Sequence, residues 1–154
     1  MNERIKTLCV VFMMSCFSMA VYSQEASDEL IEMVEQVHSA CPRAFVPGVK
    51  LKDVEIDDEF VVCTFSAEDG VFQRGGLNSE RNKESMKQSL IKNFRRMSRT
   101  SILRKMAEEV SECDMGVKGI VESEGSGESL EVVITNEEMR EATGKQNTTD
   151  IDDR

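Results

Sequence analysis

Three stretches of the chain repeat apolar residues at the three-to-four-residue spacing of an amphipathic helix. The first spans residues 25–40 and stops before Pro42, because proline cannot continue a helical backbone. The second spans residues 79–97, and a third apolar stripe starts at Ile102. Polar residues around Ser98 interrupt the two stripes, which predicts either two helices or one bent helix.

Residues 50–56 and 59–66 instead alternate apolar and polar positions, the period of a β-strand. They predict a hairpin that turns at Asp57 and Asp58, with Ile56 opposite Glu59. One face of this hairpin is then apolar and is expected to face the core: Val54, Ile56, Val61, Cys63 and Phe65.

A second hairpin is predicted from residues 116–123 and 128–135, joined by a Gly-rich turn. Thr135 and Glu138 then have the spacing of a capping box, in which each side chain satisfies a backbone N–H at a helix start. A short helix is therefore expected from Asn136.

The order of these elements is α-ββ-αα-ββ-α. It predicts an α+β fold in which two β-hairpins form an antiparallel sheet and the helices pack on one face. The chain has 154 residues, which suits a single domain, expected here over residues 24–142. Residues 143–154 are polar and acidic, and burial cannot offset the entropy of ordering them, so they are expected to form a disordered acidic tail.

The first 23 residues have the pattern of a secretory signal peptide. Two basic residues come first, 12 of the 14 uncharged residues 8–21 are apolar, and small residues precede a cut between Ser23 and Gln24. Fourteen helical residues reach only about 21 Å, short of a bilayer core of about 30 Å. Cys16 lies inside the apolar run, which disfavours lipoprotein anchoring. The sequence predicts an exported protein, periplasmic or extracellular, with no transmembrane segment after cleavage.

Three segments of the sequence, taken in order, resemble those of a known group of proteins. They are an Ala-Cys-Pro segment at residues 40–42 before a strand pair, a helix spelled Lys-x-x-Leu-Ile-Lys-Asn at residues 87–93, and a Gly-flanked strand pair ending in Val-Ile-Thr-Asn-Glu at residues 133–137. This order resembles a group of small exported bacterial α+β proteins of unknown function, over about residues 30–140. Such proteins often end the last strand in a cysteine, where this chain has Glu137 and Glu138. The resemblance therefore implies neither a disulfide pairing nor an activity.

Three cysteines follow the predicted leader: Cys41, Cys63 and Cys113. An odd number in an oxidising compartment implies one bridge and a free thiol, an intermolecular bridge, or no bridge. Cys41 and Cys113 both end helices, so we favour a bridge between them. A Cys41–Cys63 bridge and the absence of any bridge remain open.

His38 and Cys41 lie one helical turn apart, which could form half of a metal site or a thiol activated by a base. No second pair with ligand spacing completes a metal site, and no phosphate-binding loop is present. The sequence therefore predicts no metal, no cofactor and no catalytic residue. A non-catalytic binding domain is the favoured interpretation. The alternative is a small envelope enzyme that uses a thiol or carboxylate site.

The chain is acidic, with a formal charge of −10, and it contains no Trp. The only Tyr lies in the predicted leader. An acidic surface without aromatic stacking platforms argues against a nucleic-acid partner.

Charge is distributed unevenly along the chain. Residues 80–106 hold nine basic and two acidic residues, a net charge of +7, whereas the other 104 residues after the leader hold eight basic and 26 acidic residues, a net charge of −18. Basic side chains cluster around one helix end at Lys92, Arg95, Arg96 and Arg99. This patch predicts a docking surface for an acidic protein, an anionic glycan or a lipid headgroup. The alternative is a solvated helix face whose charge is balanced within the molecule.

Overall fold

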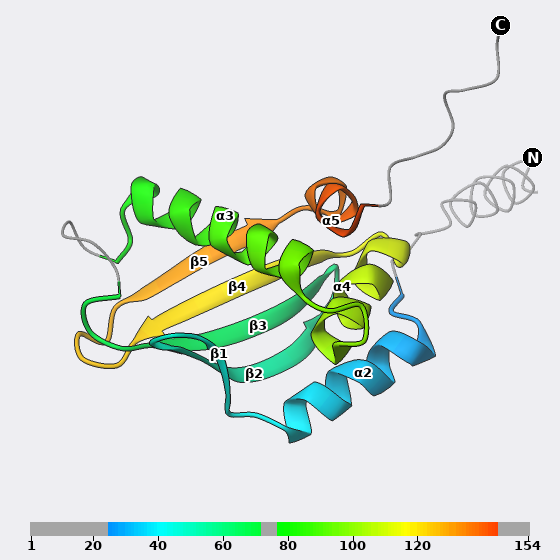
Figure 1. Ribbon diagram of the computed structural model, residues 1–154, viewed down its shortest axis with the longest axis horizontal. Coiled ribbons are helices and arrows are strands. Elements are labelled where there is room, and N and C mark those ends of the chain that lie inside the picture. The colour runs from blue at the N-terminus through cyan, green and yellow to red at the C-terminus, as the bar shows by residue number, and fades with distance from the viewer. Residues whose placement is uncertain (1–24, 72–76, 145–154) are drawn as a thin grey trace, which may run out of the picture.

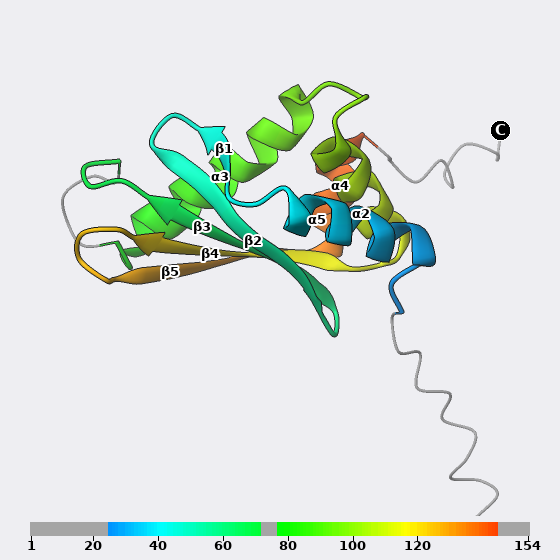
Figure 2. The same ribbon diagram turned by 90° about the horizontal axis from the view of Figure 1, so that it is seen from below.

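The computed structural model describes residues 25–71 and 77–144, in which one five-stranded sheet is covered by helices on one face (Figures 1 and 2). The strands lie in the sheet in the order in which they occur in the sequence, β1-β2-β3-β4-β5. In chain order the elements are α2 (Asp28–Ser39), β1 (Arg43–Val46), β2 (Val49–Asp57), β3 (Phe60–Ala67), α3 (Glu80–Arg96), α4 (Ile102–Glu112), β4 (Gly116–Ser123), β5 (Ser129–Ile134) and α5 (Asn136–Thr143).

The predicted α+β class and the packing of the helices on one face are confirmed, but the sheet is mixed. β2 and β3 are antiparallel, as are β4 and β5, whereas β3 and β4 are parallel. The two hairpins therefore do not form the antiparallel sheet that the sequence predicted. The reason is the α3–α4 connection, which returns the chain across the sheet so that β4 starts at the same end as β3.

The first hairpin has the predicted faces with a different register. Ile56 lies opposite Val61, not opposite Glu59. Because the two registers differ by two residues, each side chain stays on the face that the alternation predicted. The expected core residues of this hairpin, apart from the half-buried Ile56, are buried: Val54, Val61, Cys63 and Phe65.

The strand β1 was absent from the sequence prediction. It pairs with β2 across a turn at Pro47 and Gly48, where Gly48 has a φ of +77° that favours glycine. The Phe45 ring lies 5.0 Å from the Phe65 ring, between centroids, which fixes β1 to the core. The Pro-Gly pair between two short apolar segments was the signal for this hairpin.

Two of the helices, α2 and α3, begin at a serine that caps them. The side chains of Ser27 and Ser79 accept hydrogen bonds from backbone N–H groups in the first turns of α2 and α3. The apolar stripes then face the sheet, where burial removes them from water. These stripes comprise Leu30, Val34 and Val37 of α2, Met86, Leu90, Ile91 and Phe94 of α3, and Leu103, Met106 and Val110 of α4.

Helix α5 begins with the predicted capping box, since Thr135 and Glu138 each bind the other's backbone N–H. The Asn136 amide donates to the carbonyl oxygen of Met115 at 3.0 Å and so ties α5 to the start of β4. The helix ends at Thr143. Thr143, which the sequence analysis assigned to the tail, is buried in its last turn.

The other face of the sheet, here called the open face, is covered by none of the helices α2 to α5 (Figure 2). Its centre is partly apolar, and Lys118 Nζ lies 5.0 Å from the centroid of the Phe60 ring. Charged side chains surround this centre, among them Lys50, Lys52, Glu55 and Glu131.

Candidate interaction surface

Four side chains, Lys92, Arg95, Arg96 and Arg99, form a basic corner where α3 ends and the chain turns toward α4. All four are exposed. The buried stripe of α3 faces the sheet, so the basic positions between its members face outward. The α3–α4 turn lies on the helix side of the molecule, away from the sheet (Figure 2). The four residues that the sequence singled out therefore lie on the last turns of α3 and in the segment that leads to α4.

The nine basic residues between positions 80 and 106 fall into two groups. Three of them bind carboxylates of the same chain: Lys83 with Glu80 at 3.0 Å, Lys87 with Glu138 at 2.7 Å, and Arg104 with Glu108 at 2.9 Å. The other six make no ion pair with any residue in the described ranges 25–71 and 77–144: Arg81, Lys92, Arg95, Arg96, Arg99 and Lys105. Among the described residues, ion pairs therefore account for three of these basic side chains and for none in the basic corner.

Arg104 has a structural role next to this corner. Its Nη1 donates to the carbonyl oxygen of Phe94 at 2.6 Å, and its Nη2 donates to that of Thr143 at 3.0 Å. It thereby joins the ends of α3 and α5 and satisfies carbonyls that helix C-termini leave without a partner. Sequence reasoning counted Arg104 among the surface charges, because spacing alone does not show which arginine turns inward.

The surroundings of the basic corner are polar. Ser98 Oγ and Thr100 Oγ1 lie 2.9 Å apart in the α3–α4 turn. The large apolar side chains that are exposed within the described residues, Ile31 and Val71, belong to other parts of the fold. Guanidinium and hydroxyl groups suit charge-assisted hydrogen bonds to an anion. The corner lacks the apolar anchor with which a peripheral protein enters a bilayer.

All three cysteines are free thiols, and the predicted Cys41–Cys113 bridge is not formed. Ser27, the N-cap of α2, donates a 2.6 Å hydrogen bond to Glu109, one turn before Cys113. Cys41 follows the opposite end of this 12-residue helix, about 18 Å further on. A disulfide needs Cα atoms within about 7 Å. The sequence placed both cysteines at helix ends but could not show which ends lie together.

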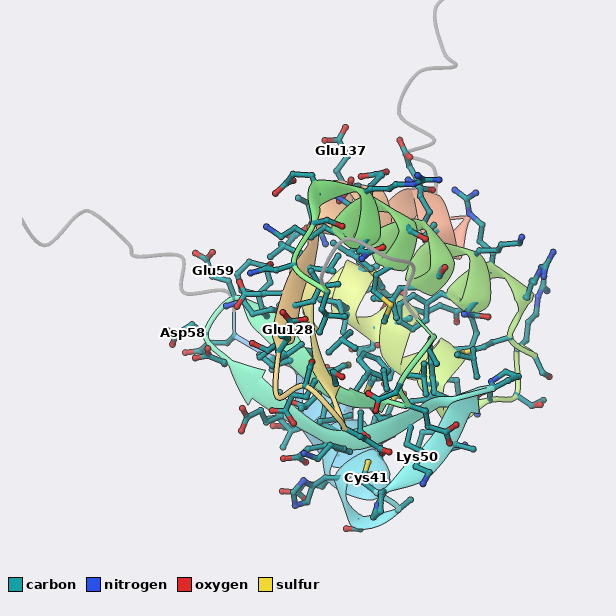
Figure 3. The ribbon with its side chains drawn as sticks, turned by 90° about the vertical axis from the view of Figure 1, so that its left-hand side faces the viewer. Cys41, Lys50, Asp58, Glu59, Glu128 and Glu137 are labelled. Carbon is teal, nitrogen blue, oxygen red and sulfur yellow. The ribbon has the colours of Figure 1, made fainter. Side chains whose placement is uncertain are left out.

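His38 and Cys41 do not form an activated thiol. The His38 Nδ1 lies 2.5 Å from the Asp53 carboxylate, and no hydrogen bond joins the Cys41 sulfur to the imidazole among the described residues. Burial raises the pKa of the Cys41 thiol, the Asp53 charge raises it further, and Arg43 partly opposes both. An activated nucleophile needs a lowered pKa. Figure 3 shows Cys41 on the α2 side of the molecule, opposite Glu137 on α5.

The acidic residues at the first hairpin turn are solvated. Figure 3 shows the side chains of Asp58 and Glu59 pointing away from the molecule. Within the described ranges, no group of three or more His, Cys, Asp or Glu side chains is placed to hold a metal ion.

The burial of Cys63 in the sheet can be tested through the pH dependence of the free energy of unfolding. Burial raises the pKa of its thiol to about 12, and Cys41 adds to this effect. The unfolded thiol loses its proton near pH 8.5, so the unfolded state binds fewer protons above that pH and is favoured. We expect the free energy of unfolding to fall by about 1.4 kcal/mol per pH unit from about pH 9 upward. Urea unfolding at pH 8, 9.5 and 10.5 measures this slope.

The matched variant for that experiment is Cys63→Ala, which is less stable at every pH but lacks the titrating thiol. Its unfolding free energy should fall less steeply above pH 9 than that of the wild type. Equal slopes in the two proteins would show that Cys63 ionises in the folded state and is not enclosed.

The predicted cleavage site at Ser23 and Gln24 lies outside the described residues, as does the tail from residue 145. In the part of the chain that is described, no helix is long and apolar enough to cross a membrane.

No protein-family model matches the chain, and no curated protein matches it. Among solved structures it is similar to a crystal structure from Pseudomonas aeruginosa described as a "putative secreted protein", with a TM-score of 0.57 and 10% sequence identity. The match covers 79% of this chain and 98% of that chain. At this identity the likeness establishes the fold. It agrees, at that level, with the resemblance to small exported bacterial α+β proteins.

Proposed function

We propose that this protein is an exported, non-catalytic interaction domain that binds an anionic partner through the basic corner. Export is supported by the charged, apolar and small-residue segments of residues 1–23. A fold shared with a protein described as secreted is consistent with it.

The proposal rests on the exposure of the four basic side chains of the corner and on their lack of ion pairs with the described residues. The basic corner is exposed and makes no ion pair with the described residues, although the chain has ten more acidic than basic residues. Its arginines do not cap Phe94 of α3, because Arg104 already binds that carbonyl. No contact among the described residues therefore accounts for the cluster, whereas binding of an anionic partner would.

The composition of the corner favours an anionic polymer over a lipid surface. Arginine binds carboxylate, sulfate and phosphate groups through a planar fork of donors. Stable attachment to a bilayer needs a second, apolar signal, which this corner lacks. The proposed partner is accordingly an anionic glycan or an acidic protein surface, and binding to lipid headgroups is an outcome that the experiment below can reveal.

The test uses the mature chain with Arg95→Ala, Arg96→Ala and Arg99→Ala together. Exposed pairs contribute about 0.5 kcal/mol each, so the triple variant should bind a heparin oligosaccharide about tenfold more weakly than the wild type at 50 mM salt. The difference should shrink at 1 M salt, where the screening length is only about 3 Å. Fluorescence anisotropy of labelled heparin measures both affinities, and vesicles with anionic lipid serve as the second probe.

A matched control removes the same charge from the open face by Lys50→Ala, Lys52→Ala and Lys118→Ala. This control should keep most of the affinity, since its lysines lie on the opposite side of the sheet from the helices. Equal loss in the two variants would reduce the effect to net charge and contradict the proposal. Absence of salt-sensitive binding by the wild type to either probe would contradict it as well.

A further inference from the structure

We propose that the acidic run at the end of this chain, Asp150, Asp152 and Asp153, occupies the basic corner when no external partner is bound. The inference rests on the proposed function, since it assigns a second, competing occupant to the same surface. It makes the tail a built-in competitor that lowers the affinity for outside anions.

The end of α5 lies directly beside the basic corner. One guanidinium, that of Arg104, donates both to the carbonyl oxygen of Thr143 in the last turn of α5 and to that of Phe94, the residue before Arg95. This shared donor places the end of α5 next to the last turn of α3, which carries Arg95 and Arg96. The chain therefore leaves the described fold at Gly144 within reach of the corner.

The length of the connection suits this contact. Asp150 lies six positions beyond Gly144. Six residues of extended chain reach at most about 20 Å. Arg104 holds the ends of α5 and α3 together, so the tail starts close to Arg95 and Arg96 in the last turn of α3.

The tail and the basic corner carry opposite charges, and each concentrates its charge in a few residues. Three of the four residues from 150 to 153 are carboxylates, and the two basic residues of the tail, Lys145 and Arg154, flank this run without interrupting it. The corner offers four cations, with Lys105 on α4 as a fifth. A short tether holds the two groups at an effective concentration in the millimolar range, so a weak contact is populated and an external polyanion can still displace it.

The first test reads the contact directly and needs no external ligand. A carbodiimide joins an Asp carboxylate to a Lys ammonium only when the two are in contact, with loss of water, and the corner presents Lys92 and Lys105 as amines. We expect cross-linked peptides between residues 146–154 and Lys92 or Lys105 in the monomer at 20 mM salt, and their loss at 0.5 M salt. A mixture of isotopically light and heavy protein identifies links within one molecule.

The second test neutralises the tail by Asp150→Asn, Asp152→Asn and Asp153→Asn. This variant should bind the heparin oligosaccharide about two- to tenfold more tightly than the wild type at 50 mM salt, with no difference at 0.5 M salt. The matched control removes three carboxylates from the far side of the molecule by Glu55→Gln, Glu59→Gln and Glu131→Gln. It should change the affinity much less.

The outcomes separate this inference from the proposed function. Tight heparin binding by the wild type, without the cross-link and without a gain in the neutral-tail variant, would overturn the tail contact and leave the docking surface standing. Equal gains in the tail variant and the control would also overturn it. If the wild type binds no anionic probe, the proposed function fails. The presence or absence of the intramolecular cross-link alone then decides whether the tail contacts the basic corner.

Discussion

Arg104→Ala is expected to lower the free energy of unfolding by about 3 kcal/mol or more. The side chain is 11% exposed and binds Glu108 and two backbone carbonyls. Its removal leaves the carbonyl oxygens of Phe94 and Thr143 without this donor, and leaves the half-buried Glu108 carboxylate without this ion pair. Chemical denaturation at pH 7 measures the loss, and amide hydrogen exchange should show the last turn of α5 opening first.

Arg104→Lys is the matched control, because it keeps the charge but carries its donors on one nitrogen, which cannot reach the three acceptors that Nε, Nη1 and Nη2 reach. It should lose about half as much stability as Arg104→Ala. A loss below about 1 kcal/mol for the alanine variant would mean that this guanidinium does not join α3 to α5. That result would also weaken the argument that α5 ends beside the basic corner.

Gly116→Ala is expected to cost about 3 kcal/mol, at the upper end of the range for overpacked cores. An added Cβ would lie 2.7 Å from the carbonyl oxygen of Ile134 and 2.9 Å from the Phe60 ring. Ile134 is fully buried in β5, and Phe60 is the strand partner of Gly116 in the parallel pair of β3 and β4. Neither neighbour can move without disturbing the sheet. Urea unfolding and the far-ultraviolet spectrum of the native state measure the effect.

Gly119→Ala in the same strand is the control. Its Cβ would first meet Leu90 Cδ1 at 3.2 Å, the flexible end of a side chain, so the cost should be about 1 kcal/mol or less. Similar losses at Gly116 and Gly119 would contradict the close backbone approach at the start of β4.

The local parts of the fold followed from spacing and from capping chemistry. Alternating apolar positions placed the right face of β3 in the core, and that assignment survived a shift in register because the shift was even. The Thr135 and Glu138 spacing correctly predicted the start of α5. These features depend on residues within a few positions of one another, which a single sequence displays.

The candidate site could also be predicted only in part, and the predictable part again depends on residues that are close in the sequence. Clustering of basic residues around one helix end was visible in the sequence, because a helix presents neighbouring turns on one surface. The sequence did not show which basic residues form ion pairs within the described part of the chain, since Lys87 binds Glu138 and Arg104 binds the end of α5, both far away along the chain. The favoured disulfide failed for a related reason, because the direction of α2 relative to α4 depends on packing.

The sequence by itself determined the α+β class, the core face of the first hairpin, the helix starts and the location of the excess positive charge. These follow from periodicity, caps and composition, which act over short stretches of chain. Tertiary structure alone decided that β3 and β4 run parallel, that Cys41 and Cys113 lie apart, and that α5 ends beside the basic corner. Each of these depends on how distant segments pack against one sheet, and no local pattern encodes that arrangement.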